Sequence, residues 1–91
     1  MTNQVGGWSS LVTPDQFTQG MKQAEEAFGT LLGVSYQPLA AQEQVVAGMN
    51  YCYFCKAQVV SPGSSAYMAR VLVYVAPGAN PVVTAVERVL P

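Results

Sequence analysis

Hydrophobic residues recur with a helical period in the segment VTPDQFTQGMKQAEEAFGTLLG, residues 12–33. Their spacings of three and four place them on one face of a helix: Phe17, Met21, Ala24, Phe28, Leu31 and Leu32. Thr13 suits the N-cap, Pro14 suits the first helical position, and Gln16 completes a Thr-x-x-Gln capping box. The pattern predicts a helix that begins at Pro14 and stops at Gly33, with its apolar stripe in the core.

After this segment the pattern changes to that of β-strands. Four stretches rich in Val, Tyr and Phe are predicted as strands, over residues 35–45, 49–60, 66–75 and 82–91. The Pro-Gly turn signals SPGSS (61–65) and PGANP (77–81) make the strands an antiparallel meander. WSSLV (8–12) is a candidate fifth strand, and Pro38 restricts its own strand to an edge or a bulged position.

This order of elements predicts an α+β fold, in which one helix packs across a four- to five-stranded antiparallel sheet. The length of 91 residues suits one core, so a single domain over residues 1–91 is expected. Gly20 and Gly29 weaken the helix by about 1 kcal/mol each, which indicates that it depends on packing against the sheet.

The composition narrows the choice of partners. The chain is 51% hydrophobic and 10% charged, with a net charge of −1, so it lacks the basic patch that nucleic-acid binding requires. No apolar run approaches the roughly 20 residues of a membrane span, and the polar start MTNQVGG is not a signal peptide. We therefore expect a soluble, cytoplasmic protein with no membrane partner. An initial methionine can be native or added, which leaves open a leader that was removed.

The sequence offers little for catalysis. Histidine is absent, and with it the commonest general base and metal ligand. Cys52 and Cys55 suggest a redox disulfide or half a zinc site, but residues three apart on a regular strand point to opposite faces, and zinc would lack two further ligands. Glu25 and Glu26 are adjacent on the helix and cannot face one another. We expect two unlinked thiols, no enzyme activity, no cofactor and no metal.

The connection between residues 35–45 and 49–60 is unusually apolar. It reads QVVAG (44–48), with no charge, no proline and no conventional turn residue except Gly48. One interpretation is a continuous strand with a bulge at Gly48. The other is the tip of a hairpin.

A family resemblance favours the hairpin. QVVAGMNY (44–51) closely resembles the first inhibitory hairpin of cystatins, in particular the stefins, whose pattern there is Gln-x-Val-x-Gly. VGG (5–7) looks like the flexible N-terminal trunk of that family, here residues 1–7, and APG (76–78) resembles the second hairpin of stefins. The order and spacing agree along nearly the whole chain. The second hairpin lacks the tryptophan seen in secreted cystatins.

The resemblance implies reversible, competitive inhibition of papain-like (cathepsin-type) cysteine proteases. In that family the trunk and the two hairpins form an apolar wedge that fills the protease cleft. Carried over by position, the protease-binding residues are Val5, Gly6, Gly7, Gln44, Val45, Val46, Ala47, Gly48, Ala76, Pro77 and Gly78. An uncharged, rigid wedge loses little hydration and little conformational freedom when it enters a cleft.

Other consequences of the resemblance concern assembly and orientation. Stefins are known for domain swapping, so a domain-swapped homodimer that opens the 44–48 hairpin is expected. The match places Tyr51, Tyr53 and Cys55 toward the helix, and it places Cys52 and Phe54 outward, which makes Cys52 the expected reactive thiol.

Two interpretations stay open beside these. A non-inhibitory interaction or ligand-binding module on the same fold is the alternative function, because a fold does not fix a function. Trp8 can pack over the core or flank the wedge, and we predict packing because most lone aromatic residues in small domains are structural.

Overall fold

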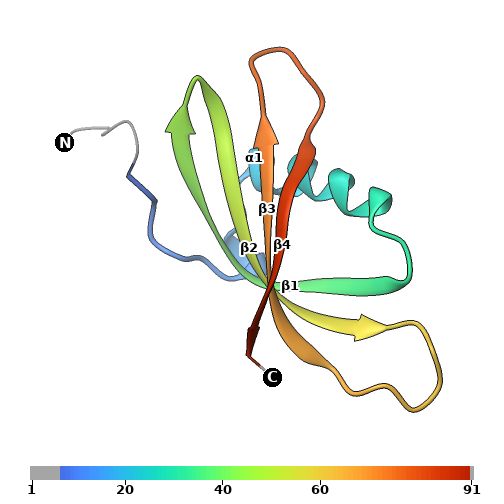
Figure 1. Ribbon diagram of the computed structural model, residues 1–91. Coiled ribbons are helices and arrows are strands. Elements are labelled where there is room, and N and C mark those ends of the chain that lie inside the picture. The colour runs from blue at the N-terminus through green and yellow to red at the C-terminus, as the bar shows by residue number, and fades with distance from the viewer. Residues whose placement is uncertain (1–6, 91) are drawn as a thin grey trace.

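The computed structural model describes residues 7–90 and shows one helical segment packed across one face of a four-stranded antiparallel sheet (Figure 1). The strands follow one another in the order β1-β2-β3-β4, and their bounds are β1 Val34–Val46, β2 Gly48–Val59, β3 Tyr67–Val75 and β4 Val82–Leu90. The predicted α+β meander is confirmed, with each strand end within one residue of its expected place.

The helix begins later than predicted. The helical elements are η1 (Pro14–Gln16) and η2 (Glu25–Thr30), both 3-10, and the α-helix α1 (Gln19–Ala24) between them. Phe17 is extended, with ψ 134°, and separates η1 from α1. The Thr18 side chain caps α1 by accepting from the Met21 backbone N–H at 3.1 Å, whereas Thr13 caps no backbone group. The break at Phe17 lets its side chain enter the core, where only 8% of it is exposed.

The predicted apolar stripe of the helix packs against the sheet except at its C-terminal end. Met21, Ala24 and Ala27 are buried against the sheet, but Leu32 is 89% exposed, so its assignment to the core is wrong. The last turns are 3-10, which advance by about 120° per residue rather than the 100° on which the stripe was drawn. Helical structure also ends at Thr30, before Leu32.

Aromatic side chains join the helix to the sheet. Tyr53 of β2 is fully buried, and its hydroxyl donates to the Met21 carbonyl at 2.6 Å. The Phe28 ring meets the Tyr53 ring edge-on, with centroids 5.0 Å apart. A Cβ at Gly20 would overlap the Tyr51 hydroxyl, so this glycine allows the close approach of α1 to β2. The inferred dependence of the helix on the sheet therefore has a direct structural basis.

The edge of the sheet at β1 is irregular. A β-bulge lies between Pro38 and Ala40, so Pro38 occupies an edge strand that is also bulged, as predicted. Within the described residues, the candidate fifth strand at 8–12 forms only two isolated bridges, Trp8 with Gln44 and Val12 with Ala41. The Ser9 side chain accepts from the Glu43 backbone N–H at 2.9 Å and replaces the backbone partner that a ladder would need.

The two cysteines point to opposite faces of β2, and both thiols are free. Cys55 lies in the core beneath the helix, where burial raises its pKa to about 12. Cys52 faces away from the helix between Gln42 and Leu72 but is only 3% exposed, and burial raises its pKa as well. The orientation matches the expectation, whereas the expected accessibility of Cys52 is contradicted.

Residues 7–90 contain neither a cluster of metal-ligating side chains nor a membrane-spanning helix. No group of three or more His, Cys, Asp or Glu side chains in residues 7–90 is arranged to hold a metal ion. Within the same residues, no helix is long and apolar enough to cross a membrane.

Candidate functional site

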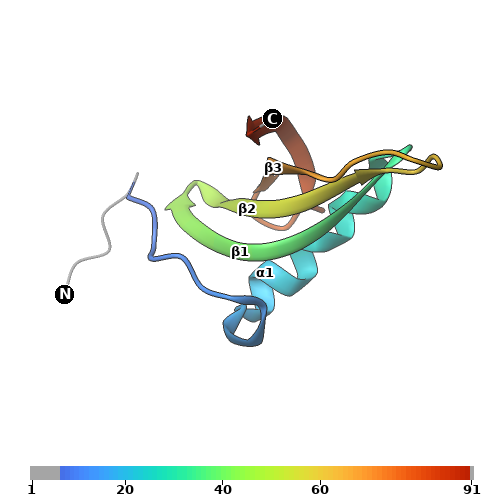
Figure 2. The same cartoon turned by 90° about the horizontal axis from the view of Figure 1, so that it is seen from below.

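Three segments meet at one end of the sheet. The β1–β2 and β3–β4 hairpins both project from this end, and the N-terminal segment approaches it alongside β1 (Figures 1 and 2). The β2–β3 loop lies at the opposite end. We call the described residues 7, 44–48 and 75–78 the hairpin edge.

The first hairpin is a tight turn. Val46 pairs with Gly48, which leaves Ala47 alone at the tip and rules out a continuous strand through residues 44–48. Gly48 has φ +101°, a left-handed conformation that favours glycine. At the base of the hairpin the Asn50 side-chain amide donates to Gln44 Oε1 at 2.8 Å. Val45 is 44% exposed, so the hairpin presents an apolar side chain to the solvent.

Gly48 also packs directly against the second hairpin. A Cβ at this position would overlap the Val75 carbonyl oxygen and lie 3.1 Å from both Ala76 Cα and Pro77 Cδ. The Tyr74 hydroxyl donates to the Ala47 carbonyl and forms a second link. The nearest constraint on a side chain at position 48 is therefore this contact within the molecule.

The second hairpin ends in a β-turn. Ala79 N–H donates to the Ala76 carbonyl at 3.0 Å, with Pro77 and Gly78 as the central residues. Gly78 has φ +72°, and a Cβ there would meet no atom within 4 Å. Proline followed by a left-handed glycine matches the requirements of a type II turn. The tip is therefore rigid and small, and it carries no aromatic side chain.

The N-terminal segment is held against the first hairpin. Trp8 is bridged to Gln44, and Ser9 N–H donates to the Glu43 carbonyl at 2.8 Å. Trp8 is 39% exposed, so it flanks the hairpin, and the prediction that it packs over the core is wrong. Gly7 is exposed just before it. Val5 and Gly6 lie outside the described residues.

The structure thus brings Gly7, residues 44–48 and residues 76–78 to one end of the sheet. It adds three side chains that sequence reasoning did not assign to the site: Trp8, Asn50 and Tyr74. Asn50 and Tyr74 are direct partners across β2 and β3, a register that sequence alone does not give. The sequence did contain a signal that Trp8 belongs to the site, because this residue directly follows the glycines of the predicted trunk.

The hairpin edge and its supports form an uncharged surface. Residues 7–12, 44–50 and 74–82 contain no charged side chain, and the Tyr74 phenol is their one titratable side chain. That phenol is engaged with the Ala47 carbonyl. This surface can bind a partner by shape, by apolar contact and through backbone groups.

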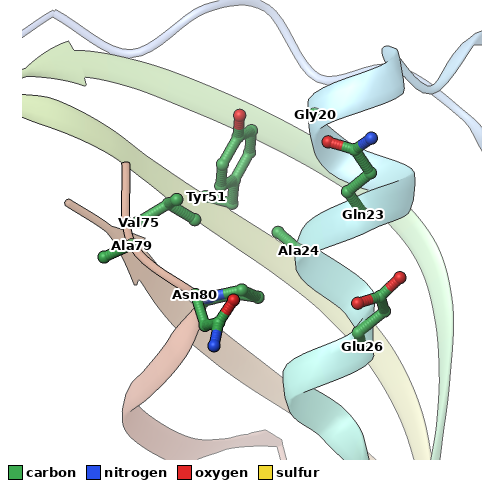
Figure 3. A pocket seen from close by; sticks show the side chains of 9 residues that line it. Gly20, Gln23, Ala24, Glu26, Tyr51, Val75, Ala79 and Asn80 are labelled. Atoms are coloured by element: carbon green, nitrogen blue, oxygen red, sulfur yellow. The ribbon is translucent and has the colours of Figure 1, made fainter. Parts of the chain in front are cut away.

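A small pocket lies behind the edge, between α1 and the β3–β4 hairpin (Figure 3). Its volume is about 270 Å³, slightly below the roughly 300 to 1,000 Å³ of typical ligand sites. The lining residues are Gly20, Gln23, Ala24, Glu26, Tyr51, Val75, Ala79, Asn80 and Pro81. The pocket separates the second hairpin from the helix on the covered face of the sheet.

Comparisons of the chain with protein families, with curated proteins and with solved structures give no match.

The link between the hairpins can be tested with Tyr74→Phe. Loss of the hydroxyl donor to Ala47 is expected to lower the free energy of unfolding by about 1 kcal/mol, and to speed amide exchange at residues 46–48. Thr84→Val is the control, because it removes a hydroxyl that donates to the Leu72 carbonyl away from the first hairpin. Equal exchange at residues 46–48 in both variants would show that Tyr74 does not hold the tip.

Proposed function

We propose that this protein is a reversible, competitive inhibitor of papain-like cysteine proteases and that the hairpin edge enters the protease cleft. The observation that supports this most is the adjacency of three uncharged segments, with Trp8 paired to Gln44 and Gly48 packed on Val75 and Ala76. Their sequences are those that resemble the binding segments of cystatins. A cystatin relationship is part of the proposal.

The hairpins suit an inhibitor because they are ordered before binding. Contacts at Ala47 and Gly48 hold the first tip, and the Ala76–Ala79 hydrogen bond closes the second. A partner that binds a preformed edge does not have to order these loops, a cost of about 0.5 to 1.5 kcal/mol for each immobilised flexible side chain. With no charge to desolvate, apolar burial contributes to affinity directly.

The residues take different parts in this proposal. Val45 and Ala47 present exposed side chains at the first hairpin, and Pro77 and Gly78 are exposed at the second. Val5, Gly6 and Gly7 supply the trunk contact that the resemblance implies. The inhibitor does no chemistry, and the protease cysteine stays unmodified.

The same contacts would protect the first hairpin from cleavage. A scissile peptide must adopt an extended form at the catalytic residues, whereas residues 46–48 form a tight turn that is tied to Tyr74 and Val75. Cleavage would require this turn to leave the second hairpin. We propose that the hairpin stays intact in the complex.

A cytoplasmic location of the protein remains a prediction.

Occupation of the cleft tests the proposal. Papain whose cleft is filled by a covalent peptide inhibitor is expected to form no complex with this protein on size exclusion. Papain treated with iodoacetamide carries only a small group on its cysteine and should still form one. Equal binding to both papain forms would place the contact outside the cleft and overturn the proposal.

A domain-swapped dimer is expected after mild heating. Exchange of α1 and β1 between two chains would turn residues 46–48 into continuous strand and separate Gly48 from Val75. The net charge of −1 opposes association only weakly. The dimer isolated by size exclusion should therefore not inhibit papain, while the monomer from the same sample should. A dimer as potent as the monomer would contradict the assigned role of the first hairpin.

A further inference from the structure

A row of five residues crosses the sheet at the base of the two hairpins. Trp8 pairs with Gln44, Gln44 with Asn50, Asn50 with Tyr74, and Tyr74 with Val82. Residues directly opposite one another in antiparallel strands project to the same face. Tyr51 and Tyr53 face the helix, so Asn50 and the rest of the row lie on the face that α1 leaves open.

Trp8 ends this row on the β1 side, where the bridge to Gln44 holds its backbone. Ser9 N–H donates to the Glu43 carbonyl, so the hydrogen bonding flanks the Trp8–Gln44 pair instead of joining it. In such non-hydrogen-bonded pairs the side chains lie closest together. The residue is 39% exposed and lies outside the core cluster, so part of its surface is presented beside the first hairpin.

We propose that Trp8 is an aromatic anchor that extends the hairpin edge onto the open face of the sheet and contacts the rim of the protease cleft. This inference rests on the proposed function. Tryptophan is enriched among interface residues that dominate affinity, because it buries a large area with few torsions to fix. The indole fits an apolar surface with a hydrogen-bond acceptor at its border for Nε1–H. Trp8 thereby supplies aromatic contact that the second hairpin lacks.

Trp8 is the one tryptophan of the chain, which allows a direct test without substitution. Protein labelled with 5-fluorotryptophan should give one fluorine resonance, and unlabelled papain gives none. On titration with papain, the resonance should shift in step with the loss of papain activity. An unchanged resonance while activity disappears would place Trp8 outside the interface and overturn the inference.

Variants provide the second measurement. Trp8→Ala is expected to raise the inhibition constant by about tenfold to a hundredfold, mainly through faster dissociation. Leu32→Ala is the matched control, because Leu32 is 89% exposed and precedes β1 at the opposite end of the sheet, so it should leave inhibition unchanged. If Trp8→Ala is folded and inhibits like the unmodified protein, the anchor is wrong while the proposed function stands. If the unmodified protein itself does not inhibit papain, the proposed function fails and the anchor fails with it.

Discussion

Gly48→Ala is expected to weaken inhibition of papain more than about a hundredfold, which corresponds to about 2.7 kcal/mol. The added Cβ would overlap the Val75 carbonyl oxygen, a backbone atom that cannot move without the second hairpin. The φ of +101° adds strain of about 1 to 2 kcal/mol for any residue with a Cβ. The two hairpins must therefore separate, and the hairpin edge loses its shape. Inhibition kinetics measure the loss of affinity for papain, and urea unfolding measures the loss of stability.

Two other glycines separate the causes of this loss. Gly78→Ala carries a similar backbone penalty at φ +72° but meets no atom within 4 Å, so it should destabilise modestly and weaken inhibition less than Gly48→Ala. Gly29→Ala, on the helix, also meets no atom within 4 Å and should be neutral or stabilising. Loss of inhibition by Gly48→Ala that is no greater than that by Gly78→Ala would mean that the contact between the hairpins is unimportant.

Alkaline pH is expected to destabilise the fold by several kcal/mol between about pH 9 and pH 11. Burial raises the pKa of Cys55 to about 12, whereas a thiol in the unfolded chain titrates near 8.5. Below about pH 8.5 the thiol is protonated in both the folded and the unfolded state, so its full contribution to stability is present. As the pH rises toward 12 the unfolded state loses its proton first, at a cost of about 1.4 kcal/mol per pH unit for this thiol. Burial raises the pKa values of Tyr53 and Cys52 as well, which adds to the loss.

Urea unfolding from pH 8 to pH 11 measures this slope, and Cys55→Ala identifies its source. The variant is less stable at pH 8 because it leaves a cavity, but its stability should fall by about 1.4 kcal/mol less per pH unit. Parallel slopes for the two proteins would show that Cys55 does not contribute. Cys52→Ala keeps the Cys55 thiol and should retain the larger part of the slope.

The strands were predictable because their signals are local. Alternation of apolar residues and the turns at 61–65 and 77–81 place the β2–β3 and β3–β4 connections without knowledge of the neighbouring strands. The break at residues 44–48 has no such turn signal. Pro38 was also informative, since a missing N–H restricts it to an edge or a bulge, and the structure places it at both.

The helix start was not predictable from local pattern. Thr13 and Thr18 are both good N-caps, and the capping box and the following proline favoured Thr13. Thr18 is the cap because a break at Phe17 lets that side chain join Tyr53 in the core, with ring centroids 6.3 Å apart. Tertiary packing therefore overrode the local signals that favour Thr13.

The candidate site was predictable in its segments but not in its construction. The letters QVVAG left a bulged strand and a hairpin both open, and only the resemblance to a cystatin hairpin favoured the second. Val46 paired with Gly48 shows that residues 44–48 form a hairpin. The packing of Gly48 on Val75, the link from Tyr74 to Ala47 and the pairing of Trp8 with Gln44 all join residues distant in sequence. Their registers depend on how the strands pair, which no local pattern specifies.

Titration of active-site-quantified papain with the purified monomer tests the central claim most directly. Papain activity should fall linearly to zero at one inhibitor per active site, and it should return when the complex is diluted into excess substrate. Mass spectrometry of the recovered protein should show an intact chain through residues 44–48. Full papain activity in the presence of a large molar excess of the folded monomer would contradict the proposed function.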